Sequence, residues 1–163
     1  QGATLAGILV ALDREERGAD TELTAIGQVR QELTMQMGSF SLEAKQCAVD
    51  LMEVCTRFHI IVEHRCCELG LRNLPPDEAK FDSKMNMQMY TQALSGLMGI
   101  YEDLRAIGVC CANEAEFQGY YVISAADPEV LSGRLCQLPP EVLTNQRMQR
   151  ALRVLSASKR LPS

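Results

Sequence analysis

Apolar side chains recur every three or four residues along most of this chain, which is the period of one face of an α-helix. The first of the two longest stripes consists of Ala44, Ala48, Leu51, Cys55, Phe58 and Val62, and the second of Met85, Met89, Ala93, Leu97, Tyr101 and Leu104. No alternation of apolar and polar residues persists long enough to predict a strand. The pattern predicts an all-α protein.

Capping residues and helix breakers divide the stripes into separate helices. Ser39 or Ser41 is expected to begin a long helix that ends near Gly70, because glycine is common directly after a helix end. The following stretch contains a Pro-Pro pair and is expected to be a loop. Asp82 or Ser83 is then expected to cap a second long helix.

Shorter helices are expected after Gly108, which should end the second long helix. Asn113 and Glu116 have the spacing of a capping box, and Pro128 suits the first position of a further short helix. A last helix is expected over residues 143–158. Successive helices joined by short loops favour antiparallel pairs stacked in a bundle or solenoid.

Charge is distributed unevenly along the 163 residues. The formal net charge of −5 argues against a dedicated nucleic-acid binder. Residues 142–163 nevertheless carry five basic residues and no acidic one. These are Arg147, Arg150, Arg153, Lys159 and Arg160. We interpret them as a candidate surface for RNA or a partner protein, with a solvated helix face of uneven charge as the alternative.

The cysteines and histidines do not form a recognisable catalytic or metal-binding pattern. The seven cysteines include no C-x-x-C pair, so we expect reduced thiols and no metal or other cofactor. His59, His64, Cys66 and Cys67 would point in different directions from one helix and cannot surround a single zinc ion. An enzyme that uses these thiols or a metal remains the alternative from another functional class.

Charged residues within apolar stretches predict ion pairs between helices. Arg30, Arg57, Glu114 and Glu116 lie beside expected core positions, and a buried charge needs a partner. We therefore expect Glu116 to pair with Arg30 or Arg57. Exposed charges without specific partners are the alternative.

Several segments together resemble the helical middle domain of the GANP/Sac-three family, which relatives of the leukocyte-receptor-cluster type share. The order and spacing of these segments are specific, whereas none is diagnostic alone. They are V-R-Q-E-L-T-M-Q at 29–36, C-T-R-F-H-I at 55–60, F-D-x-K-x-N at 81–86 with L-x-x-L-x-x-x-Y-x-D-L-R at 94–105, N-E-A-E-F-Q-G-Y at 113–120, and residues 147–156. The residues that carry the resemblance include Arg30, Arg57, Phe58, Phe81, Asp82, Glu114, Glu116, Phe117 and Tyr120.

The resemblance implies a non-enzymatic scaffold of the nuclear transcription-and-export complex two, which exports polyadenylated mRNA at the nuclear pore. It further implies a fold similar to the helical part of a PCI-type domain. The implied partners are a PCI-domain protein and a small acidic subunit of the Sem/DSS type, with RNA bound weakly or through the assembled complex and no membrane. A PCI-like subunit of another nuclear assembly, such as a proteasome-lid or splicing-linked complex, is the closest alternative.

The resemblance covers only part of the chain. Residues 1–27 match the family's pattern poorly, residues 28–157 form the expected helical domain, and residues 158–163 form a tail. The family's pattern continues into further helices and a winged helix, so we expect the domain to be truncated here.

Overall fold

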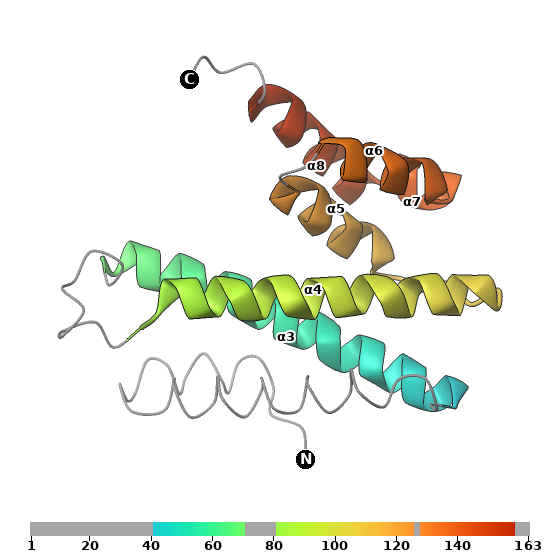
Figure 1. Ribbon diagram of the computed structural model, residues 1–163, viewed down its shortest axis with the longest axis horizontal. Coiled ribbons are helices and arrows are strands. Elements are labelled where there is room, and N and C mark those ends of the chain that lie inside the picture. The colour runs from blue at the N-terminus through green and yellow to red at the C-terminus, as the bar shows by residue number, and fades with distance from the viewer. Residues whose placement is uncertain (1–40, 71–80, 126–127, 159–163) are drawn as a thin grey trace. The chain divides into compact units, whose positions relative to one another are not determined.

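The computed structural model describes residues 41–70, 81–125 and 128–158, and all regular structure in these residues is α-helical, as predicted (Figure 1). The helices are α3 (Leu42–Glu68), α4 (Ser83–Ala106), α5 (Glu114–Ser124), α6 (Pro128–Gln137), α7 (Pro140–Thr144) and α8 (Gln146–Ser158). They fall into two compact units, one up to Ile100 and the other from Tyr101 onwards.

The ends of the two long helices are set by the residues that the sequence indicated. The Ser41 side chain accepts a hydrogen bond from the backbone N–H of Ala44, and Asp82 accepts one from Met85 at 3.0 Å. After α3, Gly70 has a φ of 71°, a left-handed conformation that glycine adopts without strain. Side-chain caps and a terminal glycine therefore fix α3 and α4 as predicted.

The apolar stripes of the first unit are correct in part. Phe58, Val62 and Phe81 form one buried cluster. Leu51 and Met85 were expected in the core, but both are exposed on the helix surface. Periodicity gives the width of a helix face, whereas the neighbouring helices decide which edge of that face is covered.

A buried polar cluster joins α3 to α4, which run antiparallel (Figure 1). Asn86 accepts a hydrogen bond from His59 Nδ1 at 2.8 Å and donates to the His59 carbonyl and the Glu63 carboxylate. Ser83 donates to the other Glu63 oxygen at 2.6 Å. The polar partners on α3 explain why Asn86, instead of Met85, turns into the protein.

The second unit begins with the closing turn of α4. The Val109 N–H donates to the Leu104 carbonyl and the Gly108 N–H donates to the Arg105 carbonyl, with Gly108 at a φ of 80°. These two bonds define a Schellman motif. Gly108 therefore ends α4 as predicted.

The Asn113 side-chain bond of the capping box predicted at the start of α5 is not formed. Asn113 does precede the helix, but its side chain makes no capping hydrogen bond. Glu116 instead directs its carboxylate to Tyr120 and Arg147. Asn113 and Glu116 have the spacing of a capping box, but the Glu116 carboxylate pairs with Arg147 of α8.

The last predicted helix is two helices. Pro140 starts the short α7, and Asn145 interrupts the chain with extended backbone at ψ 139°. The Asn145 side chain then accepts a hydrogen bond from the Arg147 N–H at 2.9 Å, close to the start of α8. In the sequence, Asn145 lies inside a helical pattern that continues on both sides of it, but asparagine is a common residue at the start of a new helix.

The core of the second unit packs α5 against α8. Val122, Leu131, Met148 and Ala151 are among its buried side chains. Gly119 permits close approach, because a Cβ at this position would lie 3.2 Å from the Cβ of Ala151. A residue with a side chain at this position would require α5 or α8 to shift by a few tenths of an ångström.

Candidate functional site

One face of α5 is built into a closed polar network. Glu114 is buried at the start of the helix, 3.4 Å from Arg105 Nε, and it accepts a hydrogen bond from Gln118 at 3.2 Å. Burial raises the pKa of Glu114, and the nearby positive charge of Arg105 opposes this shift. The carboxylate is held by its partners and faces the interior of the unit.

The same network continues into α6. Arg134 Nε donates to the Gln118 side-chain oxygen at 3.2 Å, and Arg134 Nη2 lies 2.9 Å from Glu102. The guanidinium also covers the ring of Tyr121 at 4.7 Å. Each charge in this network has an opposite charge or a hydrogen-bond partner, so we assign it a structural role.

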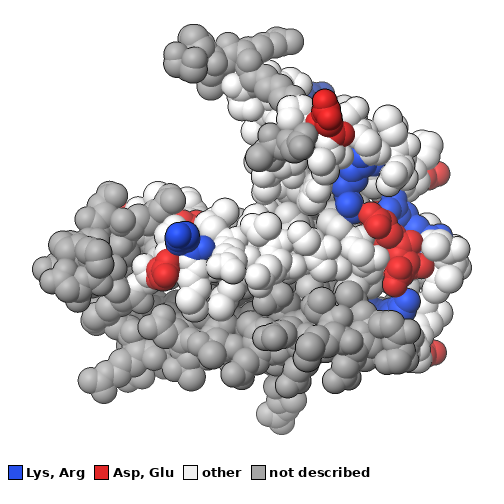
Figure 2. Space-filling view, viewed as in Figure 1, with Lys and Arg blue, Asp and Glu red and all other residues white. Residues whose placement is uncertain are grey.

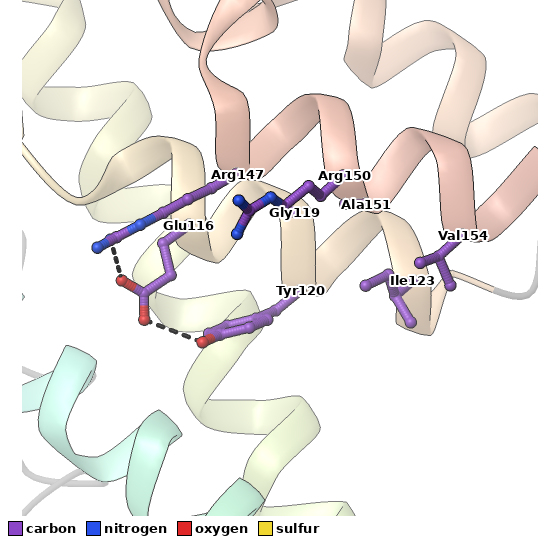
Figure 3. A pocket seen from close by; sticks show the side chains of 8 residues that line it. All are labelled: Glu116, Gly119, Tyr120, Ile123, Arg147, Arg150, Ala151 and Val154. Atoms are coloured by element: carbon purple, nitrogen blue, oxygen red, sulfur yellow. Dashed lines mark hydrogen bonds and ion pairs between the residues drawn. The ribbon is translucent and has the colours of Figure 1, made fainter.

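The groove face of α5 lies against α8. Glu116 accepts a hydrogen bond from the Tyr120 hydroxyl at 3.0 Å and forms an ion pair with Arg147 (Figure 3). The Glu116 side chain is 11% exposed and that of Arg147 is 58% exposed. This pair closes one end of a groove between the two helices.

The groove has a charged end and an apolar end (Figure 3). Arg150 stands beside the Glu116–Arg147 pair, and the apolar end is formed by Ile123 and Val154. About half of each of these two aliphatic side chains is exposed. The described residues that line the groove are Glu116, Gly119, Tyr120, Ile123, Arg147, Arg150, Ala151 and Val154.

The structure describes three of the five residues of the predicted basic surface. Arg147 and Arg150 line the groove, whereas Arg153 is exposed on α8 outside the groove lining. Lys159 and Arg160 lie outside the described residues. Two of the predicted basic residues therefore line the groove, with Arg147 engaged by Glu116, and a binding role for all five stays a prediction.

Acidic and basic side chains are also mixed elsewhere in the second unit. In the part of Figure 2 that α6 and the end of α4 occupy, Lys or Arg and Asp or Glu side chains lie next to each other. The Arg134–Glu102 pair is one such contact. Among the described residues of this face, the basic side chains are interrupted by acidic ones and form no continuous patch of the kind that follows a nucleic-acid backbone.

The other residues of the resemblance have mainly structural positions. Phe58 and Phe81 are in the core of the first unit, and Phe117 is fully buried beside Tyr101, with ring centroids 6.4 Å apart. Arg57 lies 3.5 Å from Glu53 on its own helix. Arg30 lies outside the described residues, and the pairing of Glu116 with Arg30 or Arg57 stays a prediction.

The cysteines and histidines do not gather into a site in the described part of the chain. None of the seven cysteines forms a disulfide, and no group of three or more His, Cys, Asp or Glu side chains in this part of the chain is arranged to hold a metal ion. Cys55 and His59 are both buried in α3. Burial raises the pKa of the Cys66 thiol, and Glu63 adds to the shift, so the reactive thiolate is disfavoured.

Within residues 41–70, 81–125 and 128–158, none of the helices has the length and apolar character that a membrane span requires.

Sequence reasoning missed two features of the site. The Arg105–Glu114 pair joins the end of α4 to the start of α5, and Glu114 follows Arg105 by nine residues, so helical spacing does not connect them. The second feature is the close packing at Gly119. The sequence does contain a signal for it, because a glycine inside a helix often lies where another helix packs closely.

Helical folds of this kind occur among the interaction domains of scaffold proteins, but the fold alone does not fix a function. Within this class, the comparison with protein families is specific. The chain belongs to the SAC3/GANP family, whose family model matches residues 27–161. The family is a scaffold-type family linked to mRNA export.

Three relatives illustrate the match. Protein xmas of Drosophila melanogaster is 39% identical over 106 residues, which is 64% of this chain and 5% of the relative. SAC3 family protein 1 of Schizosaccharomyces pombe is 31% identical over 135 residues, 81% of this chain and 12% of the relative. SAC3 family protein B of Arabidopsis thaliana is 30% identical over 105 residues, 60% of this chain and 6% of the relative. The chain thus corresponds to a small part of these longer relatives.

Proposed function

We propose that this chain is part of a non-enzymatic scaffold subunit of a nuclear transcription-and-export complex, acting at the nuclear pore in the export of polyadenylated mRNA. Its partners in this proposal are a PCI-domain protein and a small acidic subunit of the Sem/DSS type. The observation that carries the proposal is the family match over residues 27–161, which includes both helices of the α5–α8 groove.

RNA contact by this segment alone is expected to be weak and independent of sequence. Glu116 already engages Arg147, which leaves Arg150 and Arg153 as exposed arginines on α8. Each phosphate contact with a single strand contributes about −0.7 to the slope of log K against log salt concentration. With so few contacts, the affinity for RNA should depend only weakly on salt. The substantial RNA surface in this proposal belongs to the assembled complex.

The export role is tested by depleting the protein in cells of its source organism and locating polyadenylated RNA with a labelled oligo(dT) probe. We expect this RNA to accumulate in the nucleus and to return to a normal distribution when the full-length protein is restored. An unchanged distribution after complete depletion contradicts the role in export.

The partners are tested by purifying the tagged full-length protein from nuclear extract and identifying the stoichiometric companions by mass spectrometry. A PCI-domain protein and a small acidic subunit are expected. Subunits of the proteasome lid or of a splicing complex at equal stoichiometry, without an export partner, would support the alternative assembly instead.

A further inference from the structure

Among the described residues, the lining of the α5–α8 groove carries one positive charge that no neighbouring carboxylate of the lining neutralises. Among the lining residues, Glu116 balances Arg147. Arg150 makes no ion pair with any described residue, although it lies next to this pair (Figure 3). One negatively charged group of a ligand beside Arg150 would therefore neutralise the charge of the groove lining.

The opposite end of the groove offers an apolar contact. Ile123 is 50% exposed and Val154 is 53% exposed. Between the two ends, the groove is lined by the small residues Gly119 and Ala151, whose side chains do not fill it. Arg150 and Val154 are four positions apart on α8, which separates them by about 6 Å along the helix axis.

We propose that the groove binds an acidic segment of a partner protein, in which one carboxylate meets Arg150 and one aliphatic side chain meets Ile123 and Val154. The spacing fits an acidic and an aliphatic residue two apart in an extended segment, or three to four apart in a helix. The positive charge of Arg150 selects the acidic residue of the segment, and the apolar end of the groove selects its aliphatic residue.

The same features disfavour RNA as the occupant. A strand of RNA presents a phosphate at every nucleotide, whereas the lining of the groove supplies one uncompensated positive charge and also contains the Glu116 carboxylate. Single-stranded bases bind by stacking on aromatic rings. Tyr120 is the one aromatic residue among the described residues of the lining, and its hydroxyl is bonded to Glu116.

This inference specifies the chemistry of a partner and rests on the proposed scaffold role, but its test uses no export measurement. The 163-residue chain is immobilised and exposed to a displayed library of random 12-residue peptides. Enriched peptides are synthesised with a fluorescent label, and their Kd values are measured by fluorescence anisotropy. A labelled 12-nucleotide uridine RNA is titrated in parallel.

Two groove variants are compared with two matched surface variants. Arg150→Glu and Val154→Asp change the two ends of the groove, while Arg153→Glu and Val130→Asp make the same changes at exposed positions outside the groove lining. We expect enriched peptides to combine an acidic and an aliphatic residue. Each groove variant should weaken them about fivefold or more, because reversing one exposed charge or placing a charge at an apolar contact costs about 1 kcal/mol. The two matched variants should leave Kd within about twofold.

Several outcomes overturn the proposal. Peptides without acidic residues, no enrichment at all, or acidic peptides that bind equally well to Arg150→Glu would each exclude this occupant. Tighter binding of the uridine RNA that is lost in Arg150→Glu would assign the groove to RNA. A dimer that dissociates in Val154→Asp but not in Val130→Asp would assign it to a second copy of the chain. Thermal melts of all four variants confirm that they are folded.

Discussion

The two polar faces of α5 differ in how completely their charges are satisfied. On the inner face, Glu114 and its partners form a closed network with Arg105 and Gln118. On the groove face, Glu116 engages Arg147, and the neighbouring Arg150 is left facing the groove. Two glutamates that are two residues apart thus serve different purposes. A closed network stabilises the fold, whereas an open one is available for binding.

The largest expected effect is on the inner face. Glu114→Ala should lower the free energy of unfolding by about 3 kcal/mol, because it leaves the half-buried Arg105 and the buried Gln118 without their carboxylate partner. Chemical denaturation followed by circular dichroism measures this. A loss below about 1 kcal/mol would show that the network is dispensable.

The packing between the two faces is tested at Gly119. Gly119→Val should cost about 2 kcal/mol, because its Cβ alone would already crowd Ala151 and the two further methyl groups force α5 and α8 apart. The same change at Gly99, where no atom lies within 4 Å of the new Cβ, is the control. Gly99→Val should be neutral or slightly stabilising. Equal losses at both glycines would refute the close-approach argument.

Removing the groove-face carboxylate should have a smaller effect. Glu116→Ala is expected to cost about 1 kcal/mol, since Tyr120 loses its acceptor but the largely exposed Arg147 remains hydrated. Glu129→Ala, at the exposed start of α6, should cost only about 0.3 kcal/mol. Identical denaturation midpoints for the two variants would remove the role assigned to Glu116.

The smallest expected effect is a pH dependence that distinguishes the inner face. Because the pKa of Glu114 is raised by folding, the folded state binds more protons than the unfolded state above about pH 4.3, the ordinary value for glutamate. Stability therefore falls as pH rises from there through the raised pKa. Glu114→Gln lacks this loss, so its stability relative to the wild type should increase between pH 4 and pH 7. A relative decrease would mean that Arg105 outweighs burial and lowers the pKa.

The sequence predicted the helices better than it predicted their partners. Ser41, Asp82 and Gly108 act locally, so their effects on helix ends follow from neighbouring residues alone. The contact between Glu116 and Arg147 spans 31 residues and depends on how α5 and α8 pack. The same reason explains the exposed Leu51, because burial on one edge of a helix is decided by elements elsewhere in the chain.

The candidate site was predicted in composition but not in arrangement. Arg147 and Arg150 were selected as binding residues of the last helix; both are exposed, and their binding role stays a prediction. Their different surroundings, with one paired and one open, require the position of Glu116 in the folded unit. The aliphatic end of the groove was not predicted, because Ile123 and Val154 are far apart in sequence.

The division of labour between the two faces of α5 is tested most directly by nuclear magnetic resonance. The labelled 163-residue chain is titrated with a peptide enriched on the groove, and side-chain resonances are followed. We predict that the methyl groups of Ile123 and Val154 and the Nε–H of Arg150 shift, while the side-chain amide of Gln118 on the inner face does not. Shifts of the Gln118 amide with unchanged Ile123 and Val154 methyl groups would contradict the account.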